Sequence, residues 1–233
     1  MGRCSGVGSL ASVLLAALVA VSCASEKARD GLAFETAPLF GMIYDGEGQP
    51  CGGVRLTIDG SDGPLSDLAG RFVVPELARG GHRLVARKDG FEELAIEFAF
   101  LDRTEILHLR MTSFDQLLAG ARDALRDDRL ADAESALARA ERLDPADDVL
   151  RYLFALHAWK AGRYADAIGH LDRIAVEGGR QPAVLLLLAD IYERHLGEPR
   201  KAIENLEAYL LIRDDPDVRQ RLEEIRRRLD SGA

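Results

Sequence analysis

Few residues in this sequence have the type and spacing that catalysis or metal binding requires. His195 and Glu198 stand three residues apart and form a candidate pair of metal ligands. A catalytic zinc needs three protein ligands and an open position, and no second motif in the sequence supplies the third ligand. Cys51 follows Pro50 without a neighbouring histidine motif, so we expect a small buried residue rather than a nucleophile. The sequence therefore predicts no catalytic residues, no metal site and no cofactor, and a protein that is not an enzyme.

Composition and charge limit the classes of partner. The chain has 233 residues, a net charge of −9, 47% apolar residues and 30% charged residues. These values are typical of a folded globular protein. Because nucleic-acid binding needs a basic surface, the acidic balance argues against nucleic acid as a partner. The length allows one or two domains.

The first 22 residues are typical of an export signal. Met1–Arg3 form a short, weakly basic start, and residues 7–21 are small and apolar. The run is too short for a membrane-spanning helix, which needs about 20 apolar residues.

The end of this segment resembles the lipobox of bacterial lipoproteins, because Ala20-Val21-Ser22 precede Cys23. The resemblance implies that residues 1–22 are removed, that Cys23 is acylated, and that residues 23–37 form a lipidated tether to a membrane of the cell envelope. Ala24, rather than aspartate, follows the cysteine, which in that family implies the outer membrane, facing the periplasm or the surface. An ordinary cleaved signal peptide and an uncleaved anchor remain alternatives.

Residues 38–112 have the pattern of a small antiparallel β-sandwich. Short apolar segments alternate with turns, and Val54, Leu56 and Ile58 share one face of a period-two strand. We interpret residues 45–50 and 59–64 as turns. The segment also contains a set of motifs: Gly41-x-Ile43-x-Asp45-x-x-Gly48-x-Pro50, Gly53-Val54, Ser66-Asp67-x-x-Gly70-Arg71-Phe72, Gly81-His82-x-Leu84 and Lys88-x-Gly90-Phe91. In these motifs it resembles the carboxypeptidase regulatory-like domain, and the resemblance implies a transthyretin-like fold with no catalytic residues of its own.

Residues 113–216 are helical in pattern and repeat with a period near 34. Ala133 and Ala167 are 34 residues apart, and Ala202 follows 35 residues later. This spacing resembles three tetratricopeptide repeats, each a pair of helices that stacks on its neighbours. Residues 217–233 are interpreted as a capping helix and tail, in which Leu222 and Ile225 face inward while Arg221 and other charged residues face water. The predicted fold class is therefore β plus α, a β-sandwich followed by an α-helical solenoid.

In the tetratricopeptide family the first helix of each repeat lines a groove that holds a partner segment. The resemblance implies that eight residues of this chain bind a partner: Arg122, Arg126, Tyr152, Trp159, Lys160, Asp190, Glu193 and Arg194. Aromatic and arginine side chains are common anchors of interfaces. For Trp159, packing against a neighbouring element is an equally weighted alternative.

Two functions are consistent with these features. The first is a membrane-anchored adaptor that binds an envelope protein or peptide segment through the repeats. The alternative is an accessory subunit or a carbohydrate-binding surface protein that uses loops of the sandwich, such as residues 45–49 and 79–82.

Overall fold

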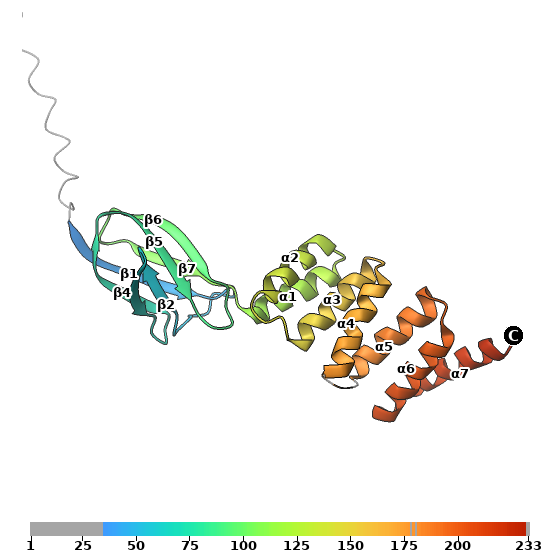
Figure 1. Ribbon diagram of the computed structural model, residues 1–233. Helices are drawn as coiled ribbons and strands as arrows, with labels where there is room; N and C mark the ends of the chain where they lie inside the picture. Colours follow the sequence, from blue (N-terminus) through green and yellow to red (C-terminus); the bar gives the residue numbers. More distant parts are fainter. Residues whose placement is uncertain (1–34, 178, 180, 232–233) are drawn as a thin grey trace, which may run out of the picture.

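The computed structural model describes residues 35–177, 179 and 181–231. It contains a β unit followed by a helical unit, and Figure 1 shows the two units end to end along the chain. The predicted signal, Cys23 and most of the predicted tether lie outside the described residues. Among the helices of the described part, none is both long and apolar enough to cross a bilayer.

The β unit consists of seven strands in two sheets. One sheet has the strand order β4-β1-β7, and the other has the order β3-β2-β5-β6. The strands are β1 Thr36–Tyr44, β2 Arg55–Ile58, β3 Ser61–Leu65, β4 Arg71–Ala78, β5 Gly80–Arg87, β6 Leu94–Phe100 and β7 Ile106–Arg110.

Buried and exposed residues alternate along the strands, so one face of each sheet lies in a shared core. In β1 every second residue from Ala37 to Ile43 is buried, while the residues between them are exposed or half-buried. Ile43 from one sheet and Leu56 and Leu84 from the other have no exposed surface and belong to a single apolar cluster. The core of the β unit therefore lies between the two sheets.

Two expectations for the β unit are wrong. Strands β1 and β7 run parallel, with Ile43 opposite Leu109, so the first sheet is mixed and not purely antiparallel. The chain crosses from one sheet to the other after β6, and the period-two pattern carries no information about the direction in which β7 then pairs. Residues 61–64, expected within a turn, belong to β3, an edge strand on β2. Pro64 is tolerated there because an edge strand has one side free of ladder hydrogen bonds.

Over its described residues, the helical unit consists of three helical hairpins and a last helix, which follow one another along the chain in Figure 1. Its helices are α1 Phe114–Arg126, α2 Leu130–Glu141, α3 Asp148–Lys160, α4 Tyr164–Glu177, α5 Pro182–Asp190 with its π-helical continuation η2 Ile191–His195, α6 Pro199–Ile212 and α7 Pro216–Ser231. Ser113 starts α1 with a capping box, in which its hydroxyl accepts from the Gln116 amide and the Gln116 side chain accepts from the Ser113 amide. Proline begins α5, α6 and α7, where its missing N–H costs nothing.

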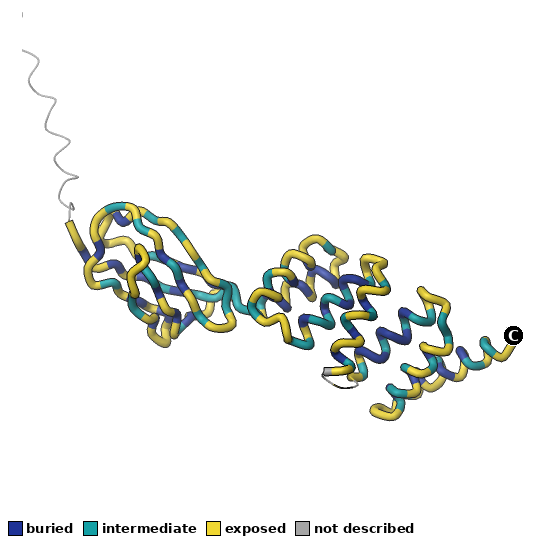
Figure 2. The backbone as a smooth tube through the Cα atoms, viewed as in Figure 1, coloured by how far each residue is buried: buried dark blue, intermediate teal, exposed yellow. Residues whose placement is uncertain are grey.

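Small residues lie where the helices of each hairpin cross. Six alanines at the repeating positions have no exposed surface: Ala121, Ala133, Ala155, Ala167, Ala189 and Ala202. A methyl side chain lets two helix backbones approach closely, and the larger apolar residues beside it fill the remaining space. Figure 2 shows the resulting buried strip on the inner sides of the helices.

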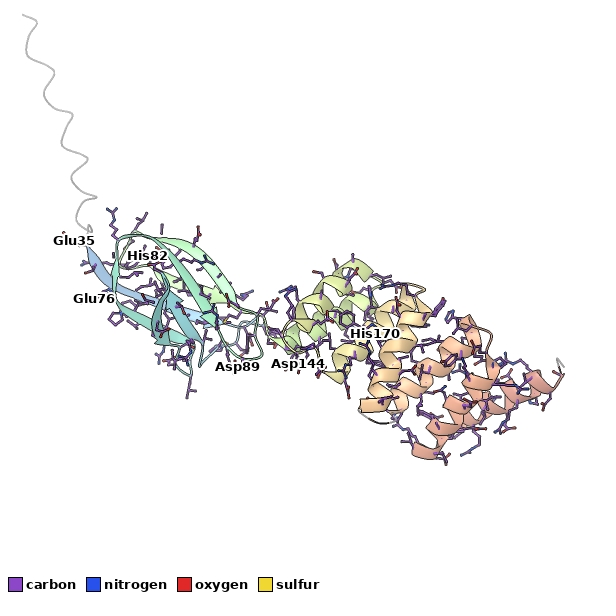
Figure 3. All side chains as sticks on the ribbon, viewed as in Figure 1. Glu35, Glu76, His82, Asp89, Asp144 and His170 are labelled. Atoms are coloured by element: carbon purple, nitrogen blue, oxygen red, sulfur yellow. The ribbon has the colours of Figure 1, made fainter. Side chains whose placement is uncertain are left out.

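The junction between the two units is short and hydrogen-bonded. The Phe114 amide donates to the Gly90 carbonyl at 2.8 Å, and the Gly46 amide donates to the Gln116 side chain at 3.2 Å. Arg139 of α2 binds the Glu92 carboxylate, with its Nε 2.9 Å from Oε1. These contacts hold one end of the β unit against α1 and α2, whereas Glu35 lies at the opposite end (Figure 3).

Gly70 allows a close backbone crossing in the β unit, which yields a testable prediction. Its φ is +75°, and a Cβ there would lie 2.4 Å from the Ile43 carbonyl oxygen. Gly48 has a similar φ of +81° but open space around the Cβ position. We expect Gly70→Ala to destabilise the β unit by about 3 kcal/mol, because alanine is strained at positive φ and its Cβ clashes with the Ile43 carbonyl oxygen. Gly48→Ala should cost only about 1 kcal/mol, because it adds the backbone strain without a clash. Amide hydrogen exchange of β1 and β5 measures both losses, and equal losses would contradict the proposed crossing.

Candidate functional site

The eight residues predicted to bind a partner come from α1, α3 and the continuous helix α5–η2, the first helices of the three hairpins. We refer to them together as the predicted face. Arg122 and Arg126 lie on α1, Tyr152, Trp159 and Lys160 on α3, and Asp190, Glu193 and Arg194 on α5–η2. Leu118 and Leu125 of α1 are buried in the apolar cluster that α1 shares with α2 and α3.

The α1 part of the predicted face is exposed and basic. The Arg126 side chain is 67% exposed and pairs with Asp123 of the same helix at 2.9 Å. Arg122 is exposed one turn earlier, and within the described part of the chain it has no hydrogen bond or ion pair. Exposed pairs of this kind contribute little to stability, so these guanidinium groups are available to a partner.

Trp159 links two hairpins. Its Nε1 donates to Nε2 of His195 at 3.2 Å, and the His195 ring stacks on Tyr164 with centroids 4.4 Å apart. Trp159 and Tyr152 are half-buried against the apolar cluster of α3, α4 and α5, and burial raises the pKa of Tyr152. Trp159 therefore has the contacts that the packing alternative predicts, and part of its surface remains accessible. Lys160, the next residue, binds Asp128 in the loop that follows α1.

The acidic residues of the predicted face are bound by α7. Arg221 donates to Asp190 at 2.6 Å and to Glu193 at 2.7 Å, and Arg228 donates to Glu193 at 2.6 Å. Burial opposes ionisation of Glu193, but the hydrogen bonds from the two arginines outweigh it and lower its pKa. Arg194 remains 63% exposed, 3.6 Å from Asp190.

The expectation that Arg221 faces water is therefore wrong, although Leu222 and Ile225 are buried as expected. Arg221 and Arg228 were also missed as members of this region. Their spacing of seven residues places them on one face of α7, and that spacing was the available signal. Nothing in the sequence paired this face with Asp190 and Glu193, because the pairing depends on how α7 packs on α6 and α5.

The candidate metal ligands His195 and Glu198 have separate partners. His195 contacts Trp159 and Tyr164, whereas Glu198 pairs with Lys201 at 2.6 Å. In the part of the chain that the structure describes, no three side chains of His, Cys, Asp or Glu are grouped to hold a metal ion. Cys51 is buried, with its Sγ 3.5 Å from the Lys88 ammonium.

The β unit contains a hydrogen-bonded cluster around His82 that forms completely only when the His82 ring carries two protons. His82 Nδ1 lies 2.6 Å from Asp59 Oδ2, and its Nε2 lies 2.8 Å from the Ala78 carbonyl oxygen. Both partners only accept hydrogen bonds, so both bonds form only when the imidazole is doubly protonated. Burial opposes the charge, but the hydrogen bonds to Asp59 and Ala78 outweigh it and raise the pKa of His82 above 6.5. The cluster borders a surface cavity of about 590 Å³, on the labelled His82 side of the β unit in Figure 3.

Comparison with known proteins adds little to this geometry. No family model matches the sequence, and no curated protein matches it. Solved structures that match include 3-chlorocatechol 1,2-dioxygenase from Rhodococcus opacus 1CP, with 15% identity, a TM-score of 0.27, and coverage of 36% of this chain and 61% of that one. Catechol 1,2-dioxygenase from Acinetobacter sp. ADP1 matches with 11% identity, a TM-score of 0.28, and coverage of 38% and 55%.

The corresponding enzyme from Pseudomonas arvilla C-1 matches with 11% identity, a TM-score of 0.25, and coverage of 36% of this chain and 54% of that one. The chain thus spans less than two thirds of each of these enzymes. Likenesses this weak carry no argument about the fold or activity of this chain.

Arg221 gives a prediction about the stability of α7. Arg221→Met keeps most of the aliphatic part of the side chain but removes the guanidinium that binds Asp190 and Glu193. We expect the free energy of unfolding to fall by about 2 kcal/mol. Arg219→Met is the matched control, because the Arg219–Asp214 pair is 56% and 78% exposed; its loss should stay within about 0.5 kcal/mol. Thermal unfolding followed by circular dichroism measures the stability of both variants, and similar losses would contradict a role for this half-buried network.

The same network predicts a pH dependence. Because the folded-state pKa of Glu193 is lowered from 4.5, its contribution is present above pH 4.5 and is lost as the pH falls through the folded value. The stability difference between the wild type and Arg221→Met should therefore shrink below pH 4.5. A difference that is unchanged in acid would contradict this linkage.

His82 predicts a pH dependence of the opposite sign. Its folded-state pKa is raised, so its contribution is fully present below pH 6.5 and is lost as the pH rises through the folded value. We expect the stability advantage of the wild type over His82→Gln to decline from pH 6 toward pH 9. Hydrogen exchange of β5 amides at several pH values measures this stability advantage. As a control, Asp59→Asn should remove most of its decline with pH. An advantage that grows with pH would contradict the charged cluster.

Proposed function

We propose that this chain is a lipid-anchored envelope protein that binds a segment of a partner protein through tetratricopeptide-type repeats. In this proposal Cys23 carries the lipid. A carboxypeptidase regulatory-like β-sandwich stands between the tether and the repeats, and the predicted face contacts the partner. The chain contributes no catalysis of its own.

One observation carries the proposal: side-chain contacts connect the first helices of the second and third hairpins, and connect α7 to the third. Trp159 of the second hairpin is hydrogen-bonded to His195 of the third, at 3.2 Å. Arg221 of α7 is bound to Glu193 of the third hairpin, at 2.7 Å. A face that is held in one arrangement before binding loses less conformational entropy when a partner orders on it.

The charges left exposed on this face support a protein partner. Arginines of α7 bind Asp190 and Glu193, whereas Arg122 is exposed and the side chains of Arg126 and Arg194 are 67% and 63% exposed. Arginine together with half-buried aromatic residues such as Tyr152 and Trp159 is a composition typical of binding hot spots.

The experiment is photo-crosslinking in cells from positions 126 and 194, with position 227 as a control. Arg227 is exposed on α7 but does not belong to the predicted face. We expect one envelope protein to be captured reproducibly from positions 126 and 194 and not from 227, and Arg126→Glu to reduce capture from 194 by about tenfold or more. Capture from position 103, in the β6–β7 loop, without capture from 126 or 194 would refute the proposal and favour the β unit as the binding part. Mass spectrometry of the mature N-terminus tests acylation of Cys23 separately.

A further inference from the structure

A second surface of the helical unit contains a formed cavity that the proposed function does not use. It has a volume of about 420 Å³ and lies between α2 and α4, over α3, a size within the range of small-ligand sites. Its floor is Phe154, His157 and Ala158. At 100° per residue these lie about half a turn around α3 from Tyr152, Leu156 and Trp159, so the cavity opens on the side of α3 away from the predicted face.

A glycine in a helix helps to form this cavity. Gly169 lies on the α4 wall, and a Cβ at this position would have nothing within 4 Å. The repeat spacing places Ser135 and Glu204 at the corresponding positions of α2 and α6. Glycine within a helix is less favourable than alanine, and here it leaves the wall without a side chain that would narrow the cavity.

An aromatic pair and a buried histidine form the inner surface. The rings of Phe154 and His170 stack with centroids 5.5 Å apart and planes 11° from parallel; His170 is labelled in Figure 3. Burial and the nearby Arg173 lower the pKa of His170, which favours the neutral ring. His157 is 4% exposed; its Nε2 donates to the Leu130 carbonyl, and its Nδ1 accepts from Arg163 at 3.2 Å.

The charges at the rim differ in whether they already have a partner. Arg163 is bound to His157 and lies 3.7 Å from Asp166, so this pair is locally compensated. Glu134 and Glu141 on α2 and Arg173 on α4 have no hydrogen bond or ion pair within the described residues. The uncompensated charge is thus two carboxylates against one guanidinium.

We propose that this cavity binds an arginine or lysine side chain of a peptide segment, with arginine preferred. A planar guanidinium can stack on the Phe154–His170 pair while it donates to Glu134 or Glu141, whereas an ammonium makes only the charged contact. Because this cavity and the predicted face lie on opposite sides of α3, the proposal does not depend on the function of that face.

The test is a nuclear magnetic resonance titration of the full-length protein with N-acetyl-arginine N-methylamide. The matched probes are the corresponding lysine, glutamine and glutamate derivatives. We expect saturable shifts of the His170 ring and the Gly169 amide with the arginine probe, weaker shifts with lysine, and none that saturate with glutamine or glutamate. Absence of saturation with arginine, or equal shifts with glutamine, would overturn the proposal.

Substitutions separate the cavity from the rest of the surface. Gly169→Leu should fill the cavity and weaken binding of the arginine probe by about tenfold or more, and Glu134→Gln with Glu141→Gln should weaken it similarly. Gly120→Leu is the matched control, because Gly120 is also a helical glycine with nothing within 4 Å of a Cβ, and it should leave binding unchanged. Circular dichroism checks that each variant is folded. Unchanged binding in folded Gly169→Leu would refute the site.

Discussion

The helical unit depends on the fact that no hairpin can bury its own apolar side chains alone. Each of the three apolar clusters in its described residues includes side chains from the hairpin or helix that follows. The first includes Leu150 and Leu153 of α3, the second includes Val184 and Leu187 of α5, and the third includes Leu222 and Ile225 of α7. Because burial of apolar surface is the main stabilising term, the hairpins are stable only as a stack.

This constraint determines what α7 does. The third hairpin would expose the apolar surface of Leu185 and Tyr209 if nothing followed it, and α7 covers this surface. Once α7 is packed there, Arg221 and Arg228 reach Asp190 and Glu193. One helix therefore ends the apolar core and also removes two negative charges from the predicted face, which leaves that face mainly basic on a chain of net charge −9.

The stack also explains why the two sides of α3 differ. On one side Trp159 is hydrogen-bonded to His195 of the next hairpin. On the other side α2 and α4 each pack on α3 and leave the space that Gly169 keeps open. The β unit is attached to this stack at one end only, where Glu92 binds Arg139, so both surfaces of the helical unit beyond α2 remain clear of it (Figure 1).

The sequence by itself determined most of the segments that form strands and helices and many of the residues that are buried. Period-two alternation identified Leu56 and Ile58 as core residues, and the alanines at intervals of 34 and 35 residues identified the helix crossings, because periodicity follows directly from the geometry of each element. Only the tertiary structure decided that β7 runs parallel to β1, that β3 is an edge strand, that His82 lies between two acceptors, and that Arg221 faces Glu193 instead of water. These features join residues that are distant in sequence, and local patterns do not encode which distant partner a strand or an arginine will meet.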